Sequence, residues 1–386
     1  DDDANKFNGK GVLKAINNIH NEITPTILGM EISDINLIDS KMIELDGTEF
    51  KSRLGANSIL AVSMACTRAG AASSGIELFR FIRNLYDPKK TEFKLPNPMF
   101  NVLNGGSHAF NSTDFQEYMV VPTGIDNFEN SISAGFEIYN KLKNILENKN
   151  LPTTLGDEGG FAPSGLSNED PLILLSKAVS ETGLSLGKDI KFALDVAASE
   201  FYDDSTGTYE LKSENKNVSP DELIKIYKNL SKDYPIYSIE DGLSEDDWNG
   251  WKKLTSNIGN NIQLVGDDLY VTQKKFLTRG IDEKAGNSIL IKLNQVGTVS
   301  ETIENIKLAQ NNNFETIISH RSGETEDTFI ADLAVGTDST QIKTGAPARG
   351  ERVNKYNRLL LISDEIKEKF NYKVKNNLVG KYKWKK

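Results

Sequence analysis

The chain of 386 residues contains one cysteine, three histidines and no long hydrophobic run. Because Cys66 has no second cysteine to pair with, an intrachain disulfide and a thiolate metal cluster are excluded, which fits a reducing compartment. No run of about 18 apolar residues is present to form a membrane-spanning helix, and the first residues lack the pattern of a secretory signal. We therefore expect a cytoplasmic protein with no membrane span.

An excess of positive charge is also missing, since the formal net charge is −10. Direct nucleic-acid binding relies on a basic surface that neutralises phosphates, so we expect none, and an anionic substrate would need cations held locally. Apolar residues make up 38% and charged residues 26% of the chain, as in globular proteins. Its length suffices for one barrel of about 250 residues and a smaller domain.

Residues 1–90 have mainly helical periodicity. Two segments, Gly9–Ile23 and Asn57–Ala72, are expected to form packing helices. Their apolar positions are Val12, Leu13, Ile16 and Ile19 in the first segment, and Ile59, Leu60, Val62 and Met64 in the second. The stretch from Tyr86 to Asn97, which contains Pro88 and Pro96, has the composition of a linker. We therefore place a domain boundary at about residue 90, between residues 1–90 and 91–386.

From residue 97 the sequence alternates short β-type runs with helix-length stretches, a pattern typical of a barrel or a wound sheet with crossover helices. Eight such runs occur, and eight is the strand number of an α/β barrel. They are Met99–Leu103, Tyr118–Val121, Phe192–Val196, Ile236–Ile239, Ile262–Val265, Ile289–Leu293, Thr316–Ile318 and Gln341–Lys343. Between two of them, the capping box Ser219-Pro220-Asp221-Glu222 predicts a helix start.

Acidic residues stand where three successive runs end. Asp195 comes after Phe192-Ala193-Leu194 in one run, Glu240 and Asp241 follow Ile236–Ile239, and Asp267 and Asp268 follow Ile262–Gly266. One acidic strand end is most simply a solvated group, but in a barrel the carboxyl ends of the strands meet at one mouth. Three carboxylates there would repel one another unless a cation lay between them, and carboxylate ligands without Cys or His favour Mg²⁺.

Two further residues suit acid–base chemistry. Lys292 lies within the apolar run Ser288–Leu293, where burial and a nearby metal would lower its pKa towards that of a useful base; alternatively, it extends from a strand end to solvent. Glu158 lies in the loop Gly156-Asp157-Glu158-Gly159-Gly160, whose glycines allow a close approach to a ligand. It is a candidate general acid, although a solvated acidic turn would have the same sequence.

Cations and histidines follow other predicted strands. His108 and His320 each come directly after a run, whereas His20 lies on the N-terminal helix and is expected to be structural. Arg321 and Ser322, near the start of a predicted helix Glu324–Val335, form a candidate phosphate site, to which Lys343 could add a second cation. A lysine base, Mg²⁺ and a phosphate site together suit proton abstraction next to a carboxylate.

These motifs resemble those of the enolases over nearly the whole chain, from Gly9-Lys10-Gly11-Val12 to the region of Glu365. The most specific strings are Asn104–His108, Gln116-Glu117, Gly156–Gly160, Ser238–Asp241, Asp267–Leu269, Lys292–Gln295, Ser319–Thr328 and Lys343–Arg349. The resemblance implies an enolase-type eight-stranded α/β barrel that begins in an irregular ββαα order. A truncated, mainly helical remnant of an α+β N-terminal domain would precede it.

The resemblance also implies an activity: the Mg²⁺-dependent, reversible dehydration of 2-phospho-D-glycerate to phosphoenolpyruvate in glycolysis and gluconeogenesis. Lys292 would be the base and Glu158 the acid. The principal Mg²⁺ would be held by Asp195, Glu240 and Asp267. The substrate would be held or lined by His108, Gln116, Glu117, His320, Arg321, Ser322 and Lys343. Further expectations from the family are a homodimer, and secondary roles as a plasminogen receptor at the cell surface or in RNA-degrading assemblies.

Two features depart from the enolase pattern. Enolases normally begin with an antiparallel sheet and a mobile serine–glycine loop whose serine binds a second Mg²⁺, whereas this chain opens at Asp1-Asp2-Asp3. We therefore expect the principal metal site and the acid–base pair to be intact, the second Mg²⁺ site to be doubtful and turnover by these residues to be slow. In addition, Phe110 follows His108 where relatives have a smaller or more polar residue.

Two other functions remain open from the sequence. The chain could be a lyase or racemase of the wider superfamily that acts on a non-phosphorylated acid, although Arg321, Ser322 and Lys343 favour a phosphorylated one. It could also be a non-catalytic interaction protein. In that case we would expect Lys292, Glu158 or a metal carboxylate to be replaced, and none is.

Overall fold

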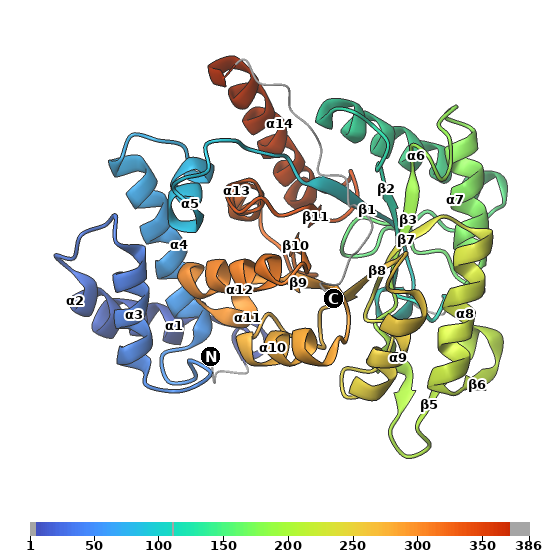
Figure 1. The fold of residues 1–386 in the computed structure, drawn as a ribbon, viewed down its shortest axis with the longest axis horizontal. Helices are drawn as coiled ribbons and strands as arrows, with labels where there is room; N and C mark the ends of the chain where they lie inside the picture. Colours follow the sequence, from blue (N-terminus) through green and yellow to red (C-terminus); the bar gives the residue numbers. More distant parts are fainter. Residues whose placement is uncertain (1–4, 110–111, 371–386) are drawn as a thin grey trace.

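The eight predicted strands are all present in the computed structural model, which describes residues 5–109 and 112–370. They close into one barrel in the order β1-β11-β10-β9-β8-β7-β3-β2 (Figure 1). The strands are β1 Asn97–Asn104, β2 Glu117–Val121, β3 Lys191–Asp195, β7 Ile236–Glu240, β8 Gln263–Gly266, β9 Ser288–Ile291, β10 Glu315–Ser319 and β11 Gln341–Lys343. The α/β barrel fold is therefore confirmed.

One strand runs against the others. β2 pairs antiparallel with both β1 and β3, while the remaining neighbours in the barrel are parallel. Two helices, α6 Phe128–Asn148 and α7 Asp170–Ser180, separate β2 from β3, so the barrel begins in the expected ββαα order. Since β2 is inverted, its first residue, Glu117, lies at the same end of the barrel as the last residues of the parallel strands.

The barrel interior is filled by side chains from alternate strand positions, as expected for a strand with one face inward. Its apolar members are Met99, Met119, Val121, Ala193, Tyr237, Val265, Leu290 and Ile317. A ring of helices covers the outer face and buries the outward-facing residues. These helices are α6 and α7 with α8 Pro220–Asp233, α9 Trp248–Ile258, α10 Lys274–Glu283, α11 Leu293–Val296, α12 Val299–Asn311, α13 Phe329–Gly336 and α14 Gly350–Phe370.

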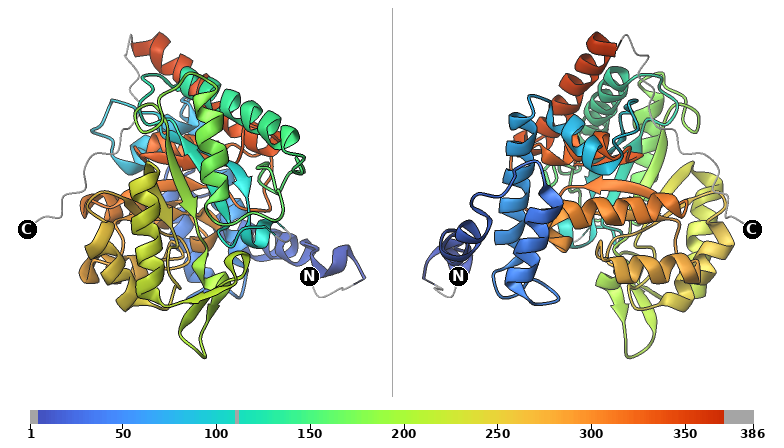
Figure 2. Two further views of the ribbon diagram at one scale, coloured as in Figure 1. Left: turned by 90° about the vertical axis from the view of Figure 1, so that its right-hand side faces the viewer. Right: turned by 60° about the vertical axis from the view of Figure 1, so that its left-hand side comes forward.

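The first helices lie beside the barrel, at the blue end of Figure 1 and in the two views of Figure 2. They are α1 Leu13–Asn18, the π-helical turn Ile19–Ile23, α2 Thr24–Ile27, α3 Ile35–Asp46, α4 Ala56–Ser73 and α5 Leu78–Tyr86. The prediction of packing helices holds for α4, where Ile59 and Leu60 are buried. The domain boundary near residue 90 stays a prediction.

In the predicted segment Gly9–Ile23 the packing prediction holds for Ile19, which packs against the core, but it is wrong for the three apolar residues before it. Val12, Leu13 and Ile16 are 55%, 61% and 40% exposed, and the core contact comes from Ile19 and from Ile23, which is fully buried. The physical reason is that α1 lies at the periphery of the molecule. Within the described part of the chain, Val12, Leu13 and Ile16 stay exposed, although Ile19 packs against the core. A periodic stripe shows which face of a helix is apolar, but tertiary structure decides whether that face is covered.

Local signals in the barrel part are mostly confirmed. Ser219 and Glu222 cap the start of α8 reciprocally, and Pro220 occupies the first turn. The sequence did not predict the small three-stranded sheet of β4 Tyr202–Asp203, β5 Thr208–Leu211 and β6 Lys216–Val218, which projects from the barrel at the lower right of Figure 1. Its strands are too short to give a clear alternation.

No single described helix is both long and apolar enough to cross a membrane, although α4 and α5 pass that test jointly by length and composition. These two helices are bent by 105° relative to each other and both contribute to the core.

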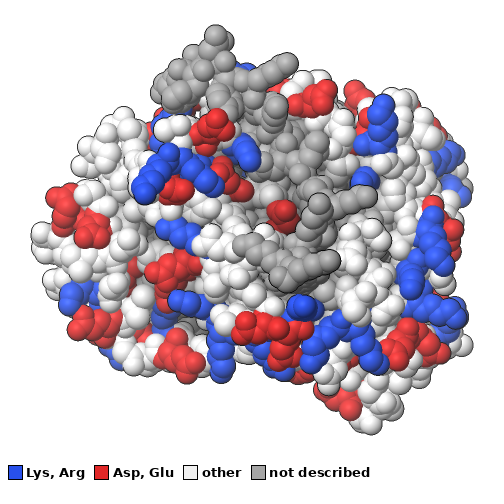
Figure 3. All heavy atoms as spheres, in the orientation of Figure 1, with Lys and Arg blue, Asp and Glu red and all other residues white. Residues whose placement is uncertain are grey.

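The visible face carries mixed charges. Figure 3 shows Lys and Arg interspersed with Asp and Glu over the described surface of that face, rather than gathered in one basic area. The expectations about Asp1–Asp3, Phe110 and the basic tail Lys381–Lys386 concern residues outside the described part of the chain.

Candidate active site

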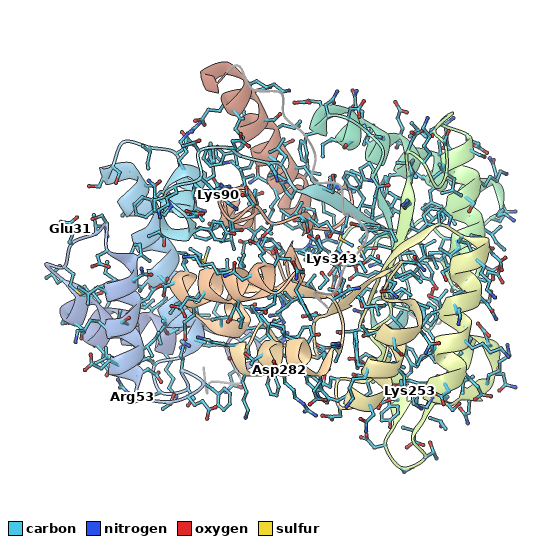
Figure 4. The ribbon with its side chains drawn as sticks, viewed as in Figure 1. Glu31, Arg53, Lys90, Lys253, Asp282 and Lys343 are labelled. Atoms are coloured by element: carbon cyan, nitrogen blue, oxygen red, sulfur yellow. The ribbon has the colours of Figure 1, made fainter. Side chains whose placement is uncertain are left out.

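The carboxyl ends of the barrel strands bring the predicted charged residues to one mouth. Asp195 and Glu240 are the last residues of β3 and β7, and Lys343 is the last residue of β11. Asp267 and Lys292 each follow the last residue of a strand. Figure 4 shows Lys343 among the strands in the middle of the molecule, whereas the labelled Lys253 and Asp282 lie at its periphery.

Lys343 is the centre of a buried ionic cluster. Its Nζ lies 2.8 Å from Asp195 Oδ2, 3.0 Å from Glu240 Oε1 and 3.2 Å from Glu117 Oε2. Burial alone disfavours the ammonium ion, but the surrounding carboxylates outweigh that effect and raise the pKa of Lys343 well above its usual value. Lys343 is therefore fixed as a cation that holds three carboxylates together.

Burial and mutual repulsion disfavour the ionised forms of these carboxylates. Burial is the largest cause that raises the pKa of Glu240 well above its usual value, and the neighbouring Asp195 adds to the shift. Burial and the charge of Glu158 do the same for Glu117. One lysine does not fully neutralise this group, so additional positive charge at the mouth would stabilise it.

Lys292 forms a second ion pair, with Asp267 Oδ2. Strand β9 ends at Ile291, so Lys292 lies just beyond the strand rather than inside it as predicted, and its backbone N–H donates to Thr272 Oγ1 at 3.0 Å. The predicted lowering of its pKa includes the effect of a bound metal and stays a prediction. Burial does favour the neutral amine, but the charges of Asp267 and Glu240 more than compensate, and the pKa of Lys292 is raised.

A further carboxylate, Asp241, organises the segment that carries Asp267. Its side chain accepts hydrogen bonds from the backbone N–H groups of Asp267, at 2.9 Å, and Asp268, at 2.8 Å. Burial, together with the charges of Asp267 and Asp268, raises the pKa of Asp241 well above its usual value. Burial and the charge of Asp267 also raise the pKa of Asp268 to about 6.

The described residues contain one group of three carboxylates whose oxygens lie within 4.8 Å of one another, and its members are Asp241, Asp267 and Asp268. The predicted ligand set of Asp195, Glu240 and Asp267 shares only Asp267 with it. An oxygen-only donor set at a mouth where carboxylate pKa values are raised fits a hard divalent cation such as Mg²⁺. Which carboxylates would hold it stays a prediction.

Glu158 lies in a tightly built loop. Asn101 Nδ2 donates to Glu158 Oε2 at 3.0 Å, and His320 Nε2 lies 3.1 Å from the same oxygen. Gly159 adopts φ +86°, and a Cβ there would lie only 3.0 Å from the carbonyl oxygen of Ala348. Glycine is therefore required at this position, which explains part of the Gly156–Gly160 motif.

The candidate phosphate residues are exposed on the loop after β10. Arg321 donates from Nη1 to Asn294 Oδ1 at 2.7 Å, and Ser322 is exposed. The predicted helix start at Glu324 is wrong, because α13 begins at Phe329, whose N–H is capped by Asp327 at 2.7 Å. A helix terminus several residues away cannot help to hold a phosphate at Arg321, so that part of the prediction fails.

The remaining predicted residues differ in their environment. Gln116 Oε1 accepts from Ser107 Oγ at 2.7 Å. Ser107 also lines a cavity of about 470 Å³ beside the mouth, together with residues of the 112–114 loop and of the β4–β6 sheet. His108 lies in a short 3₁₀ turn after β1, and its side chain is outside the described part of the structure. His20 is exposed on the π-helical turn.

Sequence reasoning missed three residues that shape the site. Asn101 stands out as a buried polar residue in the apolar run Met99–Leu103, so it could have been found. Asp241 was noticed beside Glu240 but given no role. Arg352, which contacts His320, gives no signal of its own, because an arginine is ordinarily a surface residue.

A closed eight-stranded α/β barrel with two lysines among buried carboxylates at the carboxyl ends of its strands has the architecture of a barrel enzyme. Residues 92–380 match the family model of the enolase C-terminal TIM barrel domain, and residues 1–82 match that of the enolase N-terminal domain. The protein named enolase from Sulfurimonas denitrificans is 50% identical over 365 residues, or 95% of this chain and 85% of that protein. The chain belongs to the enolase family, as the motifs indicated, and the family implies a lyase.

Proposed function

We propose that this chain catalyses the Mg²⁺-dependent, reversible dehydration of 2-phospho-D-glycerate to phosphoenolpyruvate, the glycolytic and gluconeogenic reaction of the enolases. The observation that carries the proposal is the pairing of two lysines with buried carboxylates at one barrel mouth, with Glu158 in the same end of the barrel. Bound Mg²⁺ would supply positive charge where negative charge develops on the substrate carboxylate. The carboxylates that would hold it are Asp195, Glu240 and Asp267.

Lys292 is the base in this proposal. Only the neutral amine can accept the C2 proton, so its ion pair with Asp267 must be broken before the reaction starts. The proton of C2 then moves to Lys292 Nζ, and the electrons of that C–H bond end in the new C2–C3 double bond.

Glu158 is the acid. It must enter the reaction protonated, because it gives a proton to the departing 3-hydroxyl group, which leaves as water. Asn101 and His320 both face Glu158 Oε2, so we expect the transferable proton on Oε1. Arg321, Ser322 and Lys343, with Gln116, Glu117, His108 and His320 around them, would hold or line the substrate.

A direct assay tests the proposal. The purified chain is incubated with 2-phospho-D-glycerate and Mg²⁺, and phosphoenolpyruvate is measured by its ultraviolet absorbance. We expect product that disappears with a chelator and with Lys292→Ala, while Lys253→Ala, at an exposed position paired with Asp221, behaves like the unmodified chain. Product formation that persists in Lys292→Ala would contradict the assigned base, and turnover of a non-phosphorylated acid instead would contradict the substrate.

The expected homodimer, the cytoplasmic location and the secondary roles at the cell surface or in RNA-degrading assemblies stay predictions. Each concerns surfaces or partners rather than the barrel mouth.

A further inference from the structure

A buried arginine joins the two loops that carry the candidate acid and the candidate phosphate residues. Arg352, in the first turn of α14, is 1% exposed. Its Nη1 lies 2.6 Å from His320 Nδ1 and donates to Arg321 O at 2.7 Å, while its Nη2 donates to Ser322 O at 2.7 Å and to Asp157 O at 3.1 Å. One guanidinium group therefore fixes the backbone on both sides of the site.

The contact with His320 determines where the imidazole carries its proton. A guanidinium group can only donate hydrogen bonds, so Nδ1 of His320 must be the acceptor and has no proton. The proton of the neutral ring then lies on Nε2, which is 3.1 Å from Glu158 Oε2. A second proton on Nδ1 would point at the positive charge of Arg352.

The charges around His320 agree with a neutral ring. Three charged groups face it from different elements: Glu158 from its loop, Arg352 from α14 and Lys343 from β11. The backbone N–H of His320 also donates to Lys343 O at 3.0 Å. Burial, helped by the two cations, lowers the pKa of His320 against the opposing effect of Glu158.

We propose that Arg352 is a positioning residue, which holds His320 as the neutral Nε2–H tautomer so that this ring donates to the carboxyl group of Glu158. Through its hydrogen bonds to the backbone carbonyls of Asp157, Arg321 and Ser322, Arg352 also holds the Glu158 loop next to the Arg321–Ser322 loop. The catalytic part of this inference rests on the proposed function. The tautomer does not.

Two variants distinguish the positive charge of Arg352 from its ability to contact both loops at once. In Arg352→Lys the ammonium can still only donate, so His320 keeps its tautomer, but a single nitrogen cannot bridge both loops. Arg352→Leu removes both the hydrogen-bond donor to His320 and the link between the two loops. We expect kcat to fall by about 10²-fold in Arg352→Leu, a typical cost of misplacing a reacting group, and by less in Arg352→Lys. Arg349→Leu is the matched control, because Arg349 is an exposed neighbour whose Nε donates to Glu351.

The tautomer can be read directly by ¹⁵N NMR of protein labelled at histidine. The chain has only three histidines, and His320→Gln identifies the signals of His320. In the unmodified chain and in Arg349→Leu we expect the Nε2–H form, with no titration over about pH 5 to 8, where an ordinary imidazole changes charge. In Arg352→Leu we expect both tautomers, titration of His320 within this range, and a matching change in the pH profile of kcat.

Several outcomes would overturn the proposal. One is an Nδ1–H ring or an imidazolium at His320 in the unmodified chain, a result that does not depend on any variant folding. Another is an unchanged His320 spectrum and pH profile in Arg352→Leu. If Arg352→Leu does not fold, loss of the Nε2–H tautomer in Arg352→Lys would also contradict the proposal, because the lysine keeps the donor charge. The expected spectrum in a chain that does not convert 2-phospho-D-glycerate supports the tautomer and contradicts only the proposed function.

Discussion

Replacing Lys343 with methionine tests the ionic cluster at the barrel mouth. The side chain is buried, and its Nζ contacts Asp195, Glu240 and Glu117 at 2.8 to 3.2 Å. Methionine keeps a similar unbranched stem but removes the charge. The three carboxylates would then share a buried site without their cation.

The expected loss of stability is large. Removing one partner of a buried ion pair costs about 3–5 kcal/mol, because the remaining charge has no compensation. Such a loss is a substantial part of the total free energy of unfolding, which is about 5–15 kcal/mol for typical proteins. We therefore expect Lys343→Met to lower the free energy of unfolding by about 3–5 kcal/mol at neutral pH.

The loss should depend on pH in a definite direction. In the variant, the pKa values of Glu117 and Glu240, already raised in the native protein, rise further. A carboxyl group with a raised folded-state pKa is tolerated below its unfolded pKa of about 4.3 and destabilises the fold as the pH rises through its folded pKa. The difference between the two proteins should therefore be small near pH 4 and should grow as the pH rises towards neutral.

Urea unfolding followed by circular dichroism, with and without Mg²⁺, measures these effects. Lys355→Met is the matched control, since Lys355 is also buried but pairs with a single carboxylate, Glu324 at 3.5 Å, and donates to the backbone carbonyls of Thr325 and Glu351, away from the cluster. Mg²⁺ should restore more stability to Lys343→Met than to the control, because a bound cation replaces the missing charge. If Lys343→Met lowers the free energy of unfolding by less than about 1 kcal/mol at neutral pH, the value typical of an exposed ion pair, the reasoning is refuted. A loss of stability that does not become smaller at acidic pH would refute it as well.

Three further predictions concern catalysis, charge repulsion and helix capping. Glu158→Gln should lower kcat by about 10²–10⁴-fold, the usual contribution of a general acid, while Lys292 still exchanges the C2 proton with deuterated solvent; loss of both activities would contradict the separate roles. Because the pKa of Asp268 is raised to about 6, its charge destabilises the metal-free fold as the pH rises through that value. Asp268→Asn should therefore raise the melting temperature at pH 7 but not at pH 4, and equal shifts at both would argue against repulsion. Ser219→Ala should cost about 0.5–2 kcal/mol by removing the cap of α8, with unchanged turnover; calorimetry and the product assay together check this, and a change in turnover would mean that the cap has a role at the mouth.

The sequence alone determined the strands and the identity of the residues at their ends. Each barrel strand is a short apolar run, because it is buried on both faces, and it ends where polar residues begin. Asp195, Glu240, Asp267, Lys292 and Lys343 could be named for this reason. The capping box at Ser219 is equally local, since its four residues contain the whole signal.

Tertiary structure alone decided which charges meet. Closing the sheet makes β11 a neighbour of β1, and Lys343, for which the sequence predicts a phosphate contact, also meets carboxylates from β2, β3 and β7. The raised pKa of Lys292, the exposed stripe of α1 and the reach of Arg352 to His320 likewise depend on distant parts of the chain. Burial and electrostatic interactions act through space, so residue spacing predicts the groups at the mouth but not their partners.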